Sequence, residues 1–131
     1  MADFTAEMRA IRRDYMQYQE AGDPEGCVAF WAEDGVLMPP NEPAVRGRAD
    51  LLEWYRAAFE AFEFDVQIEY EQAVCTGDWV IARALYSGTI TPKATGEPTE
   101  DRGKILEVLR RQPDGTWKWH AHTWNSDLPS G

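Results

Sequence analysis

The residues best suited to chemistry are concentrated near the end of the chain. Both histidines and three of the six tryptophans lie in the run Trp117-Lys118-Trp119-His120-Ala121-His122-Thr123-Trp124. Histidine titrates near neutral pH, so it can take up or release a proton under physiological conditions. Alternate side chains of a strand share one face. We therefore expect His120, His122 and Trp124 to face a pocket, and Trp117 and Trp119 to pack on the other side.

A carboxylate is predicted to lie beside one of these histidines. Asp114-Gly115 is a hairpin signal between this strand and the preceding one. A two-residue loop there would place Glu107 opposite His122 and Leu109 opposite His120. Directly opposed side chains are close enough to hydrogen-bond, so Glu107 would orient the imidazole of His122.

Arg83 offers Glu107 a second partner. It is the charged member of an otherwise apolar face of the predicted strand 79–91. A charged residue on such a face needs a partner. The sequence therefore leaves open whether Glu107 pairs with His122 for proton transfer or with Arg83 in a structural ion pair.

The elements that would position these residues fall into two groups. Apolar residues at spacings of three and four predict a helix over 4–20 and another over 49–62, with a shorter helix between them that begins at Asp23 and Pro24. The buried side of the short helix would carry Cys27, Val28, Phe30 and Trp31. A short strand is expected at 36–38, and β-branched and aromatic residues predict long strands over 64–75, 79–91, 103–112 and 116–126. The prediction is one α+β domain, residues 1–131, with three helices packed on one face of a curved, largely antiparallel sheet.

Composition excludes several classes of function. A net charge of −10 argues against binding to nucleic acids and to anionic membranes, which attract basic surfaces. The two cysteines are too few for a disulfide scaffold. Neither a signal peptide nor an apolar run long enough to span a membrane is evident, so we expect a cytoplasmic protein.

Several short motifs resemble one superfamily in their order and spacing. They are Gly22-Asp23-Pro24-Glu25, Phe30-Trp31-Ala32-Glu33-Asp34-Gly35-Val36, Gly47-Arg48, Gln112-Pro113-Asp114-Gly115-Thr116-Trp117-Lys118 and Trp124-Asn125-Ser126-Asp127. Together they resemble the nuclear transport factor 2-like superfamily, in particular its SnoaL-like and ketosteroid-isomerase-like members. The resemblance implies a cone-shaped fold with a pocket at its wide end, and a homodimer formed through the outer face of the sheet.

The resemblance to ketosteroid isomerase also implies roles for individual residues. Tyr15 matches the tyrosine that binds the substrate oxyanion, Glu107 matches the acid beside it, and Trp124 matches a tryptophan of the pocket wall. The position of the catalytic base, however, is Pro39, which cannot carry a proton. The comparison therefore argues against steroid isomerisation by that mechanism.

The candidate catalytic residues are thus Glu107, His122 and Tyr15. Further side chains are expected to bind the ligand because they are aromatic, apolar or charged on faces predicted to border the cone. They are Trp31, Met38, Trp54, Tyr55, Phe59, Arg83, His120 and Trp124. His120 and His122 would supply only two metal ligands, whereas protein sites usually need three or four, so we expect neither a metal nor a cofactor.

Three hypotheses remain open from the sequence. The first is a cofactor-free enzyme of the isomerase, cyclase or hydrolase type, acting on a small, partly apolar molecule. The second is a non-catalytic binding protein that uses the same cone. The third is a dimeric scaffold with a vestigial pocket. The fold does not decide among them.

Overall fold

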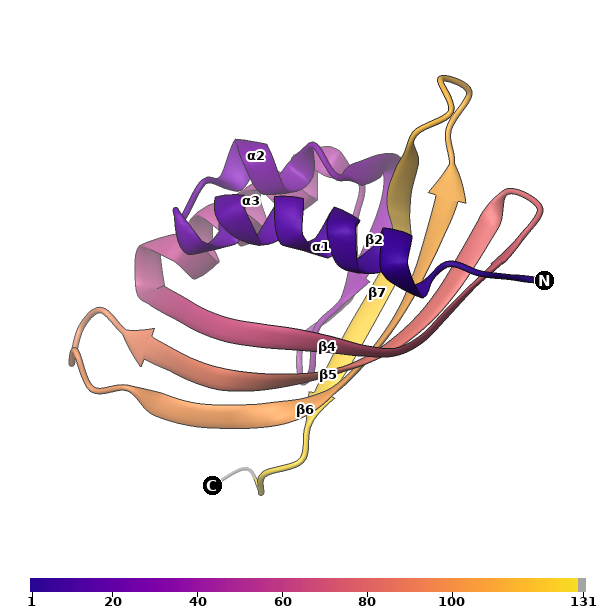
Figure 1. Ribbon diagram of the computed structural model, residues 1–131. Helices are drawn as coiled ribbons and strands as arrows, with labels where there is room; N and C mark the ends of the chain where they lie inside the picture. Colours follow the sequence, from indigo (N-terminus) through magenta and orange to yellow (C-terminus); the bar gives the residue numbers. More distant parts are fainter. Residues whose placement is uncertain (130–131) are drawn as a thin grey trace.

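Three helices pack over one face of a strongly bent sheet in the computed structural model, which describes residues 1–129 (Figure 1). The helices are α1 (Thr5–Glu20), α2 (Pro24–Val28) and α3 (Arg48–Ala61). The strands are β1 (Ala2–Asp3), β2 (Trp31–Met38), β3 (Val45–Arg46), β4 (Phe62–Thr76), β5 (Trp79–Pro92), β6 (Thr99–Arg111) and β7 (Trp117–Ser126). The α+β class expected from the sequence is confirmed.

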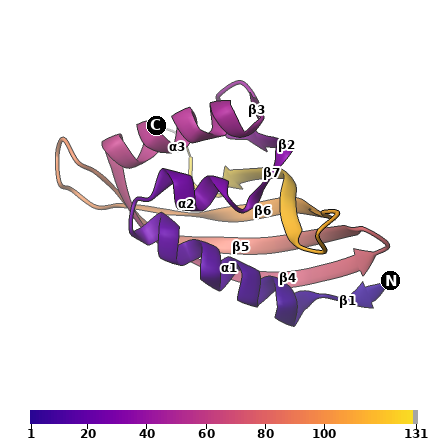
Figure 2. The same cartoon turned by 90° about the horizontal axis from the view of Figure 1, so that it is seen from above.

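The strands form one mixed sheet in the order β1-β4-β5-β6-β7-β2-β3. The neighbours β4, β5, β6 and β7 pair antiparallel, whereas β7 pairs with β2 in parallel. The last long strand is therefore inserted between β6 and the early strand β2. Seen from above, α1 runs along the β1–β4 side of the sheet and α3 covers the β2–β3 side (Figure 2).

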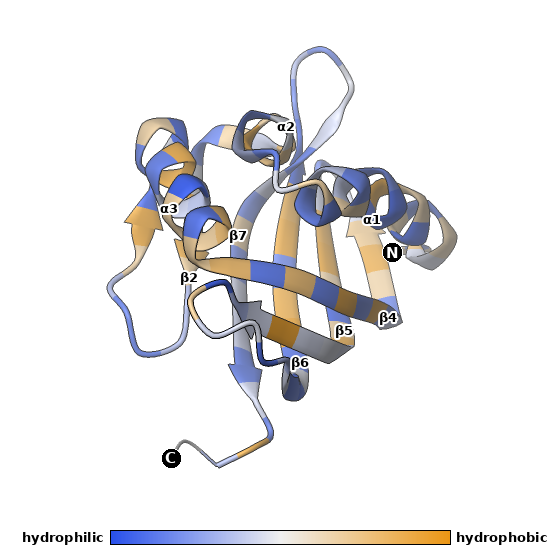
Figure 3. Ribbon diagram, turned by 90° about the vertical axis from the view of Figure 1, so that its left-hand side faces the viewer, coloured by the Kyte–Doolittle hydropathy of each residue, from blue (hydrophilic) through white to orange (hydrophobic). Residues whose placement is uncertain are grey.

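The alternation of side chains along the strands assigns one face of the sheet to the core. Buried and exposed residues alternate along β5 and β6, and hydrophilic and hydrophobic residues alternate along β4 (Figure 3). This period of two is expected for a sheet with one face on the core and the other toward solvent. The inner face meets the buried residues Met8, Tyr15, Leu51, Tyr55 and Phe59 of the helices.

Two glycines allow the long strands to curl. Gly88 on β5 has a φ of 154°, and a Cβ there would lie 2.1 Å from the carbonyl oxygen of Asp65. A Cβ on Gly103 of β6 would lie 2.1 Å from the carbonyl oxygen of Asn125. At both positions the adjacent backbone approaches too closely for any side chain, as expected where a sheet bends sharply.

Most element boundaries agree with the sequence within a few residues, but the short strands β1 and β3 were not predicted, and the start of β2 differs. Asp23 caps α2 by accepting a hydrogen bond from Gly26 N at 3.0 Å, as expected, but Trp31 begins β2 instead of lying on the helix. The strand expected at 36–38 consequently extends back to Trp31. The connection between α2 and β2 is held by Lys118 and Arg48, which donate to the carbonyl oxygens of Ala29 and Trp31.

Within residues 1–129, none of the helices combines the length and the apolar character that a membrane crossing requires.

Candidate active site

A cavity of about 140 Å³ lies between the inner face of the sheet and the helices. Most of its wall is aromatic or aliphatic, with a few polar groups. It is lined by Arg12, Tyr15, Gln19, Trp31, Leu37, Trp54, Tyr55, Ala58, Phe59, Phe64, Val66, Ile68, Tyr86, Ile90, Asp101, Ile105, Trp119, His122 and Trp124. A mostly apolar wall with a few polar anchors is typical of small-molecule sites.

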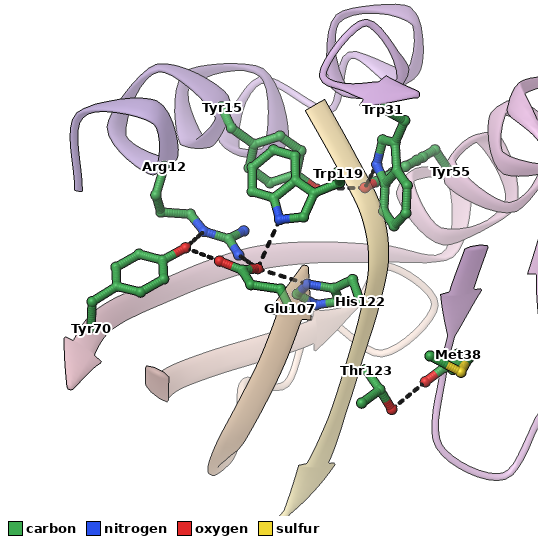
Figure 4. A network of polar contacts seen from close by, with 10 residues as sticks. All are labelled: Arg12, Tyr15, Trp31, Met38, Tyr55, Tyr70, Glu107, Trp119, His122 and Thr123. Carbon is green, nitrogen blue, oxygen red and sulfur yellow. Dashed lines mark hydrogen bonds and ion pairs between the residues drawn. The ribbon is translucent and has the colours of Figure 1, made fainter. Parts of the chain in front are cut away.

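Glu107 is the centre of a buried polar network beside this cavity (Figure 4). Its Oε2 accepts hydrogen bonds from Arg12 Nη2 at 2.6 Å, Trp119 Nε1 at 2.9 Å and His122 Nδ1 at 2.9 Å. Its Oε1 accepts a hydrogen bond from the hydroxyl of Tyr70, which also accepts one from Arg12 Nε. A buried charge is tolerated when it is paired and hydrogen-bonded in this way.

The network keeps Glu107 ionised. Burial on its own would raise the pKa of Glu107, but the charge of Arg12 and the hydrogen bonds from His122 and Tyr70 outweigh it and hold the pKa at about 2. Burial also opposes the charge on Arg12, yet the neighbouring Glu107 raises the pKa of Arg12 above its ordinary value. Glu107 is therefore a fixed anion near neutral pH and not a group that exchanges protons.

The ionised Glu107 determines the tautomer of His122. A carboxylate only accepts hydrogen bonds, so Nδ1 of His122 carries the proton that is donated to Glu107. In neutral imidazole Nε2 then has the free lone pair, and among residues 1–129 the hydrogen bond of the ring is the one made through Nδ1. Burial lowers the pKa of His122, although Glu107 acts in the opposite sense. The ring at the cavity wall is thus neutral and suited to accept a proton.

Two tyrosine hydroxyls form a second polar group in the cavity wall. The hydroxyls of Tyr15 and Tyr55 lie 2.7 Å apart, and Trp31 Nε1 donates to the Tyr55 oxygen at 3.1 Å. Burial raises the pKa of Tyr15 well above its ordinary value and raises that of Tyr55 to about 12. Both hydroxyls therefore keep their protons. One proton forms their mutual bond, so the other is available to a ligand oxygen.

The structure brings most of the predicted site residues together. Among the three candidate catalytic residues, Tyr15 and His122 line the cavity, and Glu107 lies behind His122. Among the eight candidate ligand-binding residues, those that line the cavity are Trp31, Trp54, Tyr55, Phe59 and Trp124.

Three candidate ligand-binding residues, Arg83, Met38 and His120, lie outside the cavity. Arg83 is on the outer face of β5, 3.6 Å from Glu71, so the prediction that it faces inward is wrong. Of the two partners that the sequence left open for Glu107, Arg83 is therefore ruled out and His122 is found. Arg12 from helix α1 takes the place of Arg83. Met38 is also wrongly placed by the sequence argument, since it is 39% exposed and contributes only its carbonyl oxygen, which accepts a hydrogen bond from Thr123. The next residue, Pro39, is buried and follows β2.

A bulge in β7 makes the faces of this strand differ from the predicted ones. Glu107 pairs with His122 as expected, but Leu109 pairs with Trp119 and not with His120. His120 is therefore outside the cavity, with its ring edge-on to Trp79 at 5.0 Å. Trp119, expected to pack outward, is buried and donates to Glu107.

Arg12 and Tyr70 are site residues that the sequence argument missed. Arg12 is four residues after Met8 and three before Tyr15, so it lies on the buried stripe of α1. A cation at such a position is a signal that a buried anion is opposite. Tyr70 continues the inward alternation of Phe64, Val66 and Ile68 along β4.

The comparison with known families identifies this architecture. The model of the SnoaL-like domain matches residues 12–120. The chain belongs to the SnoaL-like family. A search of curated proteins finds no match to this SnoaL-like protein.

Solved structures similar to this SnoaL-like protein share its fold over nearly the whole chain. A ketosteroid isomerase-like protein from Erwinia carotovora atroseptica is 32% identical, with a TM-score of 0.87 over 98% of this chain and 100% of that one. A nuclear transport factor 2-like superfamily protein from Salmonella enterica is 14% identical, with a TM-score of 0.80 over 97% and 93% of the two chains. A candidate dehydratase of the same superfamily from Streptomyces avermitilis is 21% identical, with a TM-score of 0.78 over 95% and 98%. The latter two are evidence for the fold alone.

Proposed function

We propose that this SnoaL-like protein is a cofactor-free enzyme that binds a small, partly apolar molecule in its cone and moves a proton on it with His122. The observation that carries the proposal is the 2.9 Å contact between Glu107 and Nδ1 of His122. It leaves Nε2 as the basic atom of a residue that lines the cavity. A neutral, oriented imidazole in an apolar cavity is the arrangement of a general base.

Tyr15 and Tyr55 supply the complementary acidic group. When a proton is removed from carbon next to a carbonyl, negative charge develops on the carbonyl oxygen. The spare hydroxyl proton of the tyrosine pair would donate to that oxygen, and the largely apolar wall would strengthen this interaction. The reaction class is therefore proton abstraction followed by isomerisation, cyclisation or elimination. Loss of water is one outcome of this class, in keeping with the name of the Streptomyces avermitilis neighbour.

The role proposed for Glu107 is positioning. It does not itself line the cavity, and its four donors keep it ionised. It orients His122, fixes its tautomer and stabilises the imidazolium that forms when Nε2 takes a proton.

The test is hydrogen–deuterium exchange on a simple ketone. 2-Tetralone carries acidic protons next to a carbonyl, and its loss of those protons in D₂O is followed by mass spectrometry. Wild-type protein should accelerate exchange above the buffer rate, and His122→Gln should abolish that acceleration. His120→Gln is the matched control, since it alters the other histidine of β7 outside the cavity, and it should exchange like the wild type.

Two outcomes would contradict the proposal. Equal exchange by wild type and His122→Gln would remove His122 from the chemistry. Binding of 2-tetralone without any acceleration would favour a non-catalytic binding protein.

We also propose that two copies of the chain pair through the outer face of the sheet. Trp79, Ile81, Leu85 and Leu106 are 36–48% exposed on neighbouring strands of that face. Arg83, between two of them on β5, and Glu71 give the same patch both signs of charge. An apolar patch with both charges is self-complementary under two-fold symmetry, which supports a second copy as the partner.

Light scattering after size-exclusion chromatography tests the dimer. Wild type should have the mass of two chains and Leu106→Lys that of one. Tyr18→Lys, which changes a 40% exposed residue of helix α1, should remain dimeric. A monomeric wild type across the concentration range would refute the pairing.

A further inference from the structure

The cavity has a second polar end, far from His122. Glu107, Ile105, Gly103 and Asp101 occupy alternate positions along β6. Six residues of strand separate Glu107 from Asp101, a distance of roughly 20 Å at the usual rise per residue. Asp101 lines the cavity together with Tyr86 and Ile90 of β5. The cavity wall therefore joins a proton-accepting end to a carboxylate end.

The Asp101 carboxylate is held in a fixed orientation. Its Oδ1 accepts from Ser126 Oγ at 2.6 Å and from Arg102 N at 2.9 Å, and its Oδ2 accepts from the Tyr86 hydroxyl at 3.1 Å. Burial and the nearby Asp101 raise the pKa of Tyr86 to about 12, so Tyr86 remains a donor. Gly103 makes room for it, because a Cβ there would lie 2.7 Å from the Tyr86 hydroxyl oxygen.

Among the residues that line the cavity, no cation is available to pair with Asp101. Of the lining residues, Arg12 and Asp101 carry formal charge, and Arg12 is committed to Glu107 at 2.6 Å. The side chains that hold Asp101 are neutral hydroxyls. Each carboxylate oxygen can accept about two hydrogen bonds, so Oδ2 retains an acceptor position beyond the one that Tyr86 uses.

We propose that Asp101 is a ligand-binding residue that selects molecules with a hydrogen-bond-donating group, above all a protonated amine, at the end distant from His122. The ligand class is thus an amphipathic molecule with an apolar body along the aromatic wall and a donor at one end. This inference rests on the proposed function, because it requires the cavity to bind a small molecule. It specifies a polar group at one end of the ligand, which the proton-transfer site alone does not.

Three probes of nearly equal size and shape test the assignment: 4-phenylbutylamine, 4-phenylbutanol and butylbenzene. Isothermal titration calorimetry at neutral pH should give affinities in the order amine, alcohol, hydrocarbon. Asp101→Asn removes the charge. Its oxygen can still accept from Ser126 and Arg102 N, and its amide can donate to the Tyr86 hydroxyl oxygen, so the fold should be retained. It should weaken binding of the amine about tenfold, as expected for loss of a charged hydrogen bond, and leave butylbenzene unchanged. Asp127→Asn, which removes an acid paired with Lys104 outside the cavity, should change none of the three affinities.

The outcomes separate this inference from the one on which it rests. Equal affinities of the three probes for the wild type, or an equal loss for amine and hydrocarbon in Asp101→Asn, would overturn the role of Asp101 and leave the cavity as a binding site. Failure of all three probes to bind would contradict the cavity as a binding site, and the role of Asp101 with it.

Discussion

Arg12 Nη2 lies 2.6 Å from Oε2 of Glu107, a buried ion pair between the first helix and the sixth strand. The two side chains are 9% and 0% exposed. The pair joins the helical layer to the sheet, next to His122, which also bonds to Glu107. It therefore links the stability of the fold to the orientation of the proposed base.

Replacing Arg12 should be severely destabilising. Arg12→Met leaves the Glu107 carboxylate buried without its cation, and removal of one partner of a buried pair costs about 3–5 kcal/mol. The free energy of unfolding from urea denaturation measures the loss. Arg13→Met, at the exposed neighbouring position, should change it by less than about 0.5 kcal/mol. The double variant Arg12→Met/Glu107→Gln should regain part of the stability. A small effect of Arg12→Met on the free energy of unfolding would show that the ion pair contributes little to stability.

Stability should decrease on acidification in two steps. The pKa of His122 is lowered in the folded protein, so the unfolded chain binds the extra proton as the pH falls below about 6.5. The folded-state pKa of Glu107 is about 2, so its contribution is present above the unfolded value of about 4.3 and is lost as the pH falls toward 2. Thermal unfolding from neutral to acidic pH should show both steps. In His122→Gln the upper step should be absent and the lower one retained. An upper step of unchanged size in His122→Gln would refute its assignment to this residue.

The proposed base should also control the pH dependence of turnover. The reaction needs neutral His122, so the exchange rate of 2-tetralone should increase with pH through the pKa of this residue and then become constant. Because burial lowers that pKa, the midpoint should lie below about 6.5. Rates per unit of protein between about pH 4.5 and 8 measure it. A midpoint above the ordinary value would contradict a buried neutral histidine.

The indole of Trp119 should contribute a measurable hydrogen bond to the network. Trp119→Phe keeps an aromatic ring in the core but removes the donor to Glu107, and hydrogen bonds to charged groups contribute about 1.5–3 kcal/mol. The loss of unfolding free energy is expected near the lower end of this range, because three donors to the Glu107 carboxylate remain. Trp117→Phe is the control, because Trp117 packs on Phe4 and Arg111 and is only partly buried. Equal losses of unfolding free energy for Trp119→Phe and Trp117→Phe in urea denaturation would show that Trp119 contributes by packing and not through its hydrogen bond.

The hairpin between β6 and β7 shows how far the sequence could predict the site. The prediction that Glu107 pairs with His122 is correct, although the two-residue turn assumed for it is wrong. Gln112 N donates to Thr116 O, so the loop has three residues, Pro113, Asp114 and Gly115, instead of two. The bulge at His120 restores the original register beyond it. The pairing was therefore predicted correctly only because two deviations cancel, while the faces of Trp119 and His120 between them were reversed.

Other parts of the site depend on contacts that no local pattern specifies. The helices and strands follow from periodicity and turn residues, and the aromatic wall follows from their buried faces. The choice of Arg12 over Arg83 as the partner of Glu107 depends on which face of β5 turns inward, and both faces of this strand carry apolar residues. Similarly, Asp101 lies before the predicted strand 103–112, whereas β6 begins at Thr99.

The position of β7 between β6 and β2 has a consequence for biosynthesis. A chain emerging from the ribosome forms α1, α2 and β2 long before the strand that joins β2 to the rest of the sheet has been made. Arg12 and its partner Glu107 are 95 residues apart in the sequence. The carbonyl oxygen of Ala29 accepts its hydrogen bond from Lys118, and Trp119 Nε1 donates to Glu107, only when the final hairpin has formed. Such long sequence separations slow folding and leave apolar surface exposed in the interval. The sheet is therefore expected to close only after β7 has been synthesised, late in the folding of the protein.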